Sequence, residues 1–323
     1  MIKKIFAVRE VPIITAFAVL LVTIEISNHK FLSASGIHDI LFGVAVVGLL
    51  AVAESLVIVM RHVDLSVGST IGLSAYLIGR ESAQGHGLLF VLLAGLICGL
   101  LVGAVNGFLV GYLRLPSLVV TLGTLYVVRG LFSQIAGGDS INGDQIPKVL
   151  AFMGGNTLFG IPYLFIVALA FTFATGWTMR NWRSARDLYA IGSNPAASRL
   201  VGIPVARRTF FAFLSAGAIT GLAGAVLLAR FSHAEANSGL GIELTVVTAC
   251  VVGGVAIAGG VGTVYGALIG ALLLQTITLA LGAVGVSQFW QGVVTGILLV
   301  AAITLDKVLS SRITVTRILK VDA

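Results

Sequence analysis

The sequence predicts an all-α protein that crosses a membrane about ten times, and three observations lead to this prediction. First, the 323 residues are 58% hydrophobic and only 10% charged, with a mean hydropathy of +1.06. Second, apolar stretches of about 20 residues, the length of a membrane-crossing helix, follow one another closely. Third, the 40 glycines lie inside these stretches without a collagen-like period, as expected where membrane helices pack closely.

About ten segments have the length and apolar character of membrane helices. The third and eighth contain only about 15 residues, so we expect them to be tilted, broken or re-entrant. The first follows basic residues as a signal peptide would, but no small-x-small cleavage site precedes the polar residues 28–30, which favours an uncleaved helix. The predicted spans are residues 12–27, 40–60, 66–80, 88–113, 116–136, 160–179, 209–230, 243–258, 262–284 and 288–305.

The basic residues predict the orientation of these spans. Fifteen of the 20 Lys and Arg residues fall in segments that are cytoplasmic if both termini lie inside. The positive-inside rule therefore predicts cytoplasmic termini. The net charge of +7 does not indicate a nucleic-acid partner, because the basic residues lie in short segments between apolar stretches and form no amphipathic stripe.

Glycine recurs at every fourth position in two predicted spans. This spacing leaves one bare helix face along which a neighbouring backbone approaches closely, so both helices are expected to be central in the bundle. The glycines are Gly95, Gly99, Gly103, Gly107 and Gly111 in the fourth span, and Gly262, Gly266 and Gly270 in the ninth.

No soluble domain, catalytic site or cofactor site is predicted. The chain has no G-x-x-x-x-G-K-[ST] stretch, so it lacks a Walker-type ATP site, and any ATP must be used by a partner subunit. The five histidines are scattered without metal-ligand spacing, and Cys98 and Cys250 lie in apolar segments. Residues 137–160 have a composition that favours turns. We therefore predict a single transmembrane domain over residues 1–323, without metal, cofactor or enzymatic activity.

The longest cytoplasmic segment, residues 180–208, contains the signals of a short helix. Ser193 or Asn194 is a suitable N-cap, Pro195 suits the first helical position, and Gly202 is a suitable stop. Taken alone, a capped basic helix of this kind is also compatible with simple binding to lipid headgroups.

Four sequence motifs resemble ribose-type ABC sugar permeases. Residues 190–204, AIGSNPAASRLVGIP, closely resemble the cytoplasmic coupling segment of that family, which docks on the ATPase subunit. The resemblance continues at VDLSVGS (63–69), TLGTLYVVRG (121–130) and ACVVGG (249–254) with the later glycine pair 259–260, and it covers about residues 40–306.

The resemblance implies a set of partners and a set of coupling residues. The partners are an ABC ATPase, a second permease subunit that is identical or paralogous, and a periplasmic solute-binding protein, in a bacterial inner membrane. The implied coupling residues are Ser193, Asn194, Pro195, Ala196, Ala197, Arg199 and Gly202.

One departure from the family pattern leaves the solute open. Many members carry paired glycine before the Asp-Leu-Ser motif, whereas this chain has Arg61-His62. This Arg-polar pair resembles the one that some autoinducer-2 and deoxysugar permeases carry. The predicted solute is therefore a pentose, a hexose or a deoxysugar, with autoinducer-2 as the alternative.

Polar residues within the apolar spans are candidates for the translocation pathway. Glu54 is an ionisable residue at membrane depth, which indicates either a functional site or a structural pair with Arg61. Arg129 either shapes the pathway, binds at the outer interface or pairs with a loop carboxylate.

The remaining pathway candidates are short polar side chains. Asp64 and Ser66 precede a short span, where an aspartate is suited to cap exposed amides. Asn106, Thr121 and Thr124 either bond between helices or line a path for a neutral, hydroxyl-rich solute.

A self-sufficient secondary carrier or channel is the competing interpretation. It would also contain glycine-broken helices and short spans. Such a carrier is expected to have internal repeats and ion-site carboxylates, whereas this sequence has no evident repeat and Glu54 alone is a poor ion site.

Overall fold

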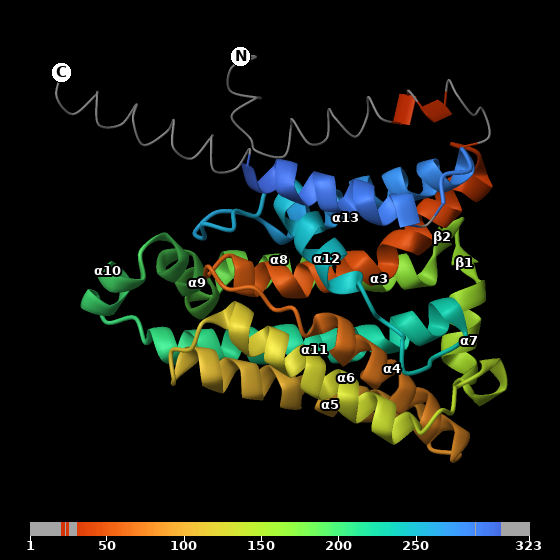
Figure 1. Ribbon diagram of the computed structural model, residues 1–323, viewed down its shortest axis with the longest axis horizontal. Helices are drawn as coiled ribbons and strands as arrows, with labels where there is room; N and C mark the ends of the chain where they lie inside the picture. The colour runs from red at the N-terminus through yellow and green to blue at the C-terminus, as the bar shows by residue number, and fades with distance from the viewer. Residues whose placement is uncertain (1–20, 23, 26–30, 288, 305–323) are drawn as a thin grey trace.

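The computed structural model describes residues 21–22, 24–25, 31–287 and 289–304, and these form an almost entirely helical bundle (Figure 1). The predicted all-α class is confirmed, with one two-stranded hairpin as the exception. The first predicted span and both termini lie largely outside the described residues. The long apolar helices are α3 (Ala34–Ile58), α5 (Leu88–Gly111), α6 (Ser117–Ala136), α8 (Tyr163–Asn181), α11 (Val205–Phe231) and α13 (Val264–Ala283).

By length and composition, these six described helices are able to cross a membrane, so the chain is a multi-pass membrane protein. Three further predicted spans correspond to shorter helices, namely α4 (Val67–Ala83), α12 (Ile242–Val252) and the helix Phe289–Thr304. The predicted end of the eighth span at residue 258 is wrong. Helix α12 stops at Val252 because Gly253 follows it and Gly254 adopts a positive φ of 86°.

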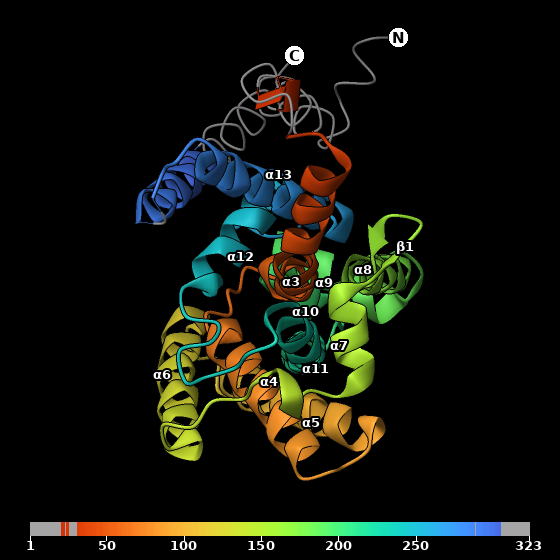
Figure 2. The ribbon, with the colours of Figure 1, turned by 90° about the vertical axis from the view of Figure 1, so that its right-hand side faces the viewer.

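Helices α3 and α11 form the centre of the bundle (Figure 2). In the most apolar window of each helix, 89% of the residues of α3 and 72% of those of α11 are buried. Helix α11 packs against α5, α4 and α3, and α3 also packs against α13, α8 and α12. The two central helices therefore hold together elements that are distant in the sequence.

The glycine face of α5 packs against α11, which confirms the predicted close approach. A Cβ atom on Gly99 would lie only 2.0 Å from the carbonyl oxygen of Gly217, and one on Gly103 would lie 2.5 Å from that of Phe213. The prediction that α5 is central is wrong, because only 28% of its apolar window is buried. Its other face carries exposed large side chains such as Leu101 and Phe108.

The remaining elements lie at the two ends of the bundle (Figure 1). Helices α9 (Arg183–Ser193) and α10 (Pro195–Leu200) are at one end. The opposite end holds η1 (Gly143–Gln145), α7 (Lys148–Gly155) and the antiparallel strands β1 (Thr157–Leu158) and β2 (Ile161–Pro162). Residues 137–160 thus contain a helix that their turn-like composition did not predict.

Candidate functional site

The chain reverses direction after α3 and forms the core of the candidate site. Helix α3 ends at Ile58, Arg61 takes a positive φ of 70°, and α4 begins at Val67. The connecting residues include Asp64 and Ser66, which are 3% and 1% exposed. Figure 1 shows this connection running back between the helices, so α4 begins inside the bundle.

Six of the seven predicted pathway residues lie in one buried hydrogen-bond cluster, which we name the Asp64 cluster: Glu54, Asp64, Ser66, Asn106, Thr121 and Thr124. At its centre, the Asp64 Oδ1 atom accepts hydrogen bonds from the backbone N–H of Ser66 at 2.8 Å and from its hydroxyl at 2.6 Å. This contact fixes the turn that starts α4, although the acceptor is not a standard N-cap residue of the helix.

Helices α5 and α6 complete the Asp64 cluster. The Asn106 side-chain amide donates to the Ser66 hydroxyl at 2.9 Å and lies 3.4 Å from both Asp64 carboxylate oxygens. The Thr124 hydroxyl donates to Asn106 Oδ1 at 2.7 Å, and the Thr121 hydroxyl donates to the Val63 carbonyl at 3.2 Å. The cluster therefore joins α5, α6 and the start of α4 through polar side chains.

Glu54 reaches the Asp64 cluster from α3. Its Oε1 atom accepts a hydrogen bond from the backbone N–H of Asp64 at 2.9 Å, and Glu54 is fully buried. The expected pairing of Glu54 with Arg61 is wrong. Because α3 ends at Ile58 and the chain turns outward at Arg61, the guanidinium lies outside the bundle, toward α9.

Arg129 lies apart from the Asp64 cluster. One of its terminal nitrogens donates to the carbonyl oxygens of Ala236 and Ser238, each at 2.8 Å. These contacts fasten residues 232–241, the connection between α11 and α12, to α6. The carboxylate of Glu243 interacts electrostatically with the same guanidinium, so Arg129 connects α6 both to this connection and to a charge on α12.

The predicted short helix is present as α10, and its local signals behave as the sequence predicts. Asn194 is its N-cap, with the side chain accepting from the Ala197 N–H at 3.0 Å, and Pro195 is its first residue. Gly202 follows with a φ of 80°. Ala196, Ala197 and Arg199 of α10 are exposed, as is Ser193 at the end of α9, so these residues are accessible to a partner.

Helix α9 was not predicted, although its sequence contains the signal. Ala185, Leu188, Ile191 and Gly192 recur at helical spacing and are its buried residues. Because this segment is short and contains three charged residues, it has no membrane-span signature. The apolar face of α9 packs against α8 and α11 at this end of the bundle, and α10 follows directly after α9 in the chain.

Three distant segments meet where α9 ends, at a contact we name the inner joint: residues 59–62, 192–193 and 259–262. The Arg61 guanidinium donates to the carbonyl oxygen of Gly192 and, at 2.7 Å, to that of Ser193. The Gly260 N–H donates to the Val59 carbonyl at 2.8 Å. Gly192 is required here, because a Cβ atom would lie 1.8 Å from the Val59 oxygen.

Two ring side chains at the inner joint are affected by burial. The Tyr189 hydroxyl donates to the Gly262 carbonyl at 3.0 Å, and burial raises its pKa. Burial lowers the pKa of His62 to about 4, so its imidazole is neutral at physiological pH, and the ring lies 5.9 Å from that of Phe213. Both residues therefore act as uncharged packing and hydrogen-bonding groups.

We expect Asp64→Ala to destabilise the bundle. The substitution removes the acceptor of the Ser66 N–H and hydroxyl, and an unsatisfied buried polar group costs about 1–3 kcal/mol. The melting temperature of the purified protein in detergent measures the effect. Asp139→Ala, at an exposed loop carboxylate, is the matched control and is expected to be neutral. Equal melting temperatures for both variants would contradict a structural role for the cluster.

The chemistry of the Asp64 cluster is hydrogen bonding. Its groups are hydroxyls, one amide and two carboxylates, the kind of groups that bind hydroxyl-rich molecules or fix helix positions. In the part of the chain that the structure describes, no group of three or more His, Cys, Asp or Glu residues is placed to hold a metal ion.

Comparisons with known proteins identify related permeases over most of the chain. The autoinducer 2 import system permease protein LsrC of Yersinia pseudotuberculosis is 33% identical over 310 residues, 95% of this chain and 87% of the relative. LsrC of Enterobacter sp. strain 638 is 33% identical over 94% of this chain and 88% of its own length. The L-arabinose ABC transporter permease protein AraH of Azospirillum brasilense is 32% identical over 91% and 86%.

These relatives confirm the resemblance to ABC permeases of the sugar and autoinducer-2 branch. No solved structure matches the chain. A family model described as "Branched-chain amino acid transport system / permease component" matches residues 36–303, which extend from the first turn of α3 through α13. The chain therefore belongs to this family of transport-system permease components.

Proposed function

We propose that this chain is the membrane permease subunit of a bacterial ABC importer that takes up a small sugar. The main structural support for this proposal is the set of contacts at the inner joint. It ties the base of α10, through Arg61, to the chain segment that leads within three residues to the Asp64 cluster. A partner that pushes on α10 thus has a direct connection to buried polar groups in the bundle, as coupling requires.

The proposed mechanism divides the work among subunits. An ABC ATPase binds and hydrolyses ATP and docks on α10, while this chain binds neither ATP nor another cofactor. A periplasmic binding protein delivers the solute to the opposite end, and a second permease subunit completes the membrane core. The chain forms a single domain of about ten spans in the bacterial inner membrane, with both termini and α10 in the cytoplasm.

A pentose, hexose or deoxysugar is the proposed solute class. The Asp64 cluster offers hydroxyl and amide groups, and neutral sugars need no charge compensation in the membrane. Autoinducer-2 is the second candidate. It is supported by the LsrC relatives and by the Arg61-His62 pair, whereas AraH supports a pentose.

Purification from native membranes tests the proposed function. The tagged full-length chain is isolated in mild detergent, and co-purifying proteins are identified by mass spectrometry. We expect a stoichiometric P-loop ATPase, and we expect the purified assembly, after reconstitution, to import labelled arabinose, ribose or autoinducer-2 in an ATP-dependent manner. A chain deleted over residues 194–207 is expected to lose both the ATPase and uptake. A solitary chain that transports alone would instead establish a self-sufficient carrier.

A further inference from the structure

A cleft on the side of the bundle is separate from the Asp64 cluster and from the inner joint. It has a volume of about 570 Å³, within the range of small-ligand sites, and lies between α8, α9 and α11. Its floor includes the buried side chains of Leu56 and Ala212, and its outer side is open at Phe211 and Trp182, which are 45% and 55% exposed. The cleft thus opens sideways between two membrane-crossing helices.

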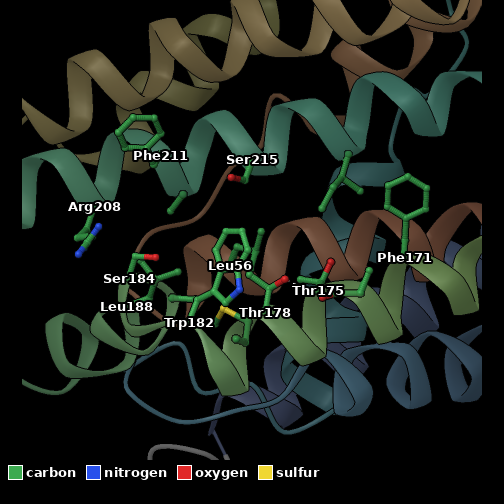
Figure 3. Close-up of a pocket in the computed structure, with 15 residues that line it drawn as sticks. Leu56, Phe171, Thr175, Thr178, Trp182, Ser184, Leu188, Arg208, Phe211 and Ser215 are labelled. Carbon is green, nitrogen blue, oxygen red and sulfur yellow. Dashed lines mark hydrogen bonds between the residues drawn. The ribbon is translucent and has the colours of Figure 1, made fainter.

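The lining of the cleft changes from polar to apolar along its length. Figure 3 shows Arg208 and Ser184 at the end near α9, and Phe171 at the opposite end, with Thr178 and Thr175 between them along α8. A molecule with a polar head and an apolar tail fits this gradient. A sugar does not, because most of the lining is apolar.

Exposed basic residues neighbour the lining of the polar end. Arg183 lies between the lining residues Trp182 and Ser184 in the chain, and the guanidinium of Arg207 lies 5.7 Å from the ring centre of Phe211, which also lines the cleft. Arg180 and Arg186 are exposed in the same segment. Arg208 is neutralised by Asp187, at 2.8 Å. Since Asp187 is the only acidic residue between positions 180 and 208, the end of the cleft has a net positive charge.

Two exposed tryptophans mark the depth of this end in the bilayer. Trp177 and Trp182 are 58% and 55% exposed, and their ring centres are 6.4 Å apart. Tryptophan is enriched at the level of lipid headgroups, and clustered arginines at that level attract acidic lipids. The arginines therefore lie where headgroups lie, and the apolar end of the cleft lies at the depth of acyl chains.

We propose that the cleft between α8, α9 and α11 binds one anionic phospholipid. An acyl chain fills the apolar part toward Phe171, and the headgroup phosphate binds Arg183 and Arg207. A lipid at this position contacts α9, so it stabilises the segment from which α10 projects. The binding requires neither solute nor ATPase, so it is measured independently of the proposed function.

Photo-crosslinking in nanodiscs tests this site. The full chain is placed in phosphatidylcholine nanodiscs with a small fraction of phosphatidylglycerol or phosphatidylcholine that carries a diazirine on one acyl chain, and labelled peptides are mapped by mass spectrometry. We expect the phosphatidylglycerol probe to label α8 and α11 around the cleft more strongly than the lipid-exposed face of α5. The phosphatidylcholine probe is expected to label both regions equally.

Two variants separate the headgroup from the acyl chain. The double variant Arg183→Gln/Arg207→Gln is expected to lower the preference for the anionic probe about fivefold or more, since each basic residue near the surface contributes about that factor. Ser215→Phe, which fills the cleft, is expected to remove cleft labelling while α5 labelling remains. Arg114→Gln, at a basic residue on the α5–α6 turn, is the matched control and is expected to change nothing.

Several outcomes would overturn the proposal. These are equal labelling of the cleft by both probes, cleft labelling no stronger than that of α5, and an anionic preference that survives the double arginine variant. Crosslinking of the cleft to another protein in the native assembly would also overturn it. The double arginine variant alters only exposed side chains, so the test does not depend on whether Ser215→Phe folds.

Discussion

Gly99→Val is expected to disrupt the bundle, because the contact between α5 and α11 has no space for a side chain. The new Cβ atom would lie 2.0 Å from the carbonyl oxygen of Gly217 and 2.7 Å from the backbone nitrogen of Gly221. The obstructing atoms are backbone, so the helices must separate. Overpacking typically costs 1–3 kcal/mol, and we expect a loss of about 3 kcal/mol or more because the contact continues along most of α5.

The melting temperature and the fraction of monodisperse protein in detergent measure this loss. Gly123→Val is the matched control, since it makes the same change in a membrane-crossing helix at a position with no atom within 4 Å of the new Cβ. It is expected to leave both measurements unchanged. Equal melting temperatures for the two variants would contradict the close backbone contact between α5 and α11.

The sequence predicts the existence of this contact but not the partner of α5. Every fourth residue of α5 is glycine, so the bare face follows directly from the spacing. Helix α11 supplies the complementary Gly217 and Gly221, and nothing in either segment alone indicates that these two faces meet. The same limit explains the wrong prediction that α5 is central, since a glycine face determines only one side of a helix.

Short helices were the hardest elements to predict. The local signals of α10 predicted its start, because Asn194 and Pro195 act through nearest neighbours. Helix α9 lies next to it and does carry apolar residues at helical spacing, but the segment is short and charged, so it lacks the signature of a membrane span. The end of α12 at Val252 was also missed, since the Gly253-Gly254 pair is compatible with both a helix and a break.

The candidate site was predicted as a set of residue types, and the structure determined which of them meet. Six of the predicted pathway residues lie in the Asp64 cluster, although Asn106 and Asp64 are 42 positions apart. Their residue types do not determine whether they cap a helix, bond between helices or line a path, because a polar side chain in an apolar bundle satisfies its hydrogen bonds in any of these ways. The contacts of Arg61 and Arg129 were not predictable either, because both donate to backbone carbonyls that any sequence provides.

Arg61→Gln is expected to uncouple ATP hydrolysis from solute uptake. Arg61 is the only side chain described here that bonds the end of α9 to the segment preceding Asp64, and glutamine is too short to keep both of its contacts with Gly192 and Ser193. A motion of α10 would then reach the Asp64 cluster less efficiently. Coupling free energies between sites are typically 1–3 kcal/mol, so we expect solute transported per ATP to fall at least about fivefold.

The assay uses the complete reconstituted transporter and measures ATP hydrolysis and uptake in the same vesicles. Arg114→Gln is the matched control, because Arg114 also follows a membrane-crossing helix and also adopts a positive φ, of 59°. It is expected to retain the normal ratio. An unchanged ratio in the Arg61 variant, whether both rates stay normal or fall together, would show that the inner joint does not transmit the motion of α10. Only a lower ratio at normal hydrolysis identifies Arg61 as the connection between the ATPase and the polar cluster, because that outcome separates force transmission from both stability and catalysis.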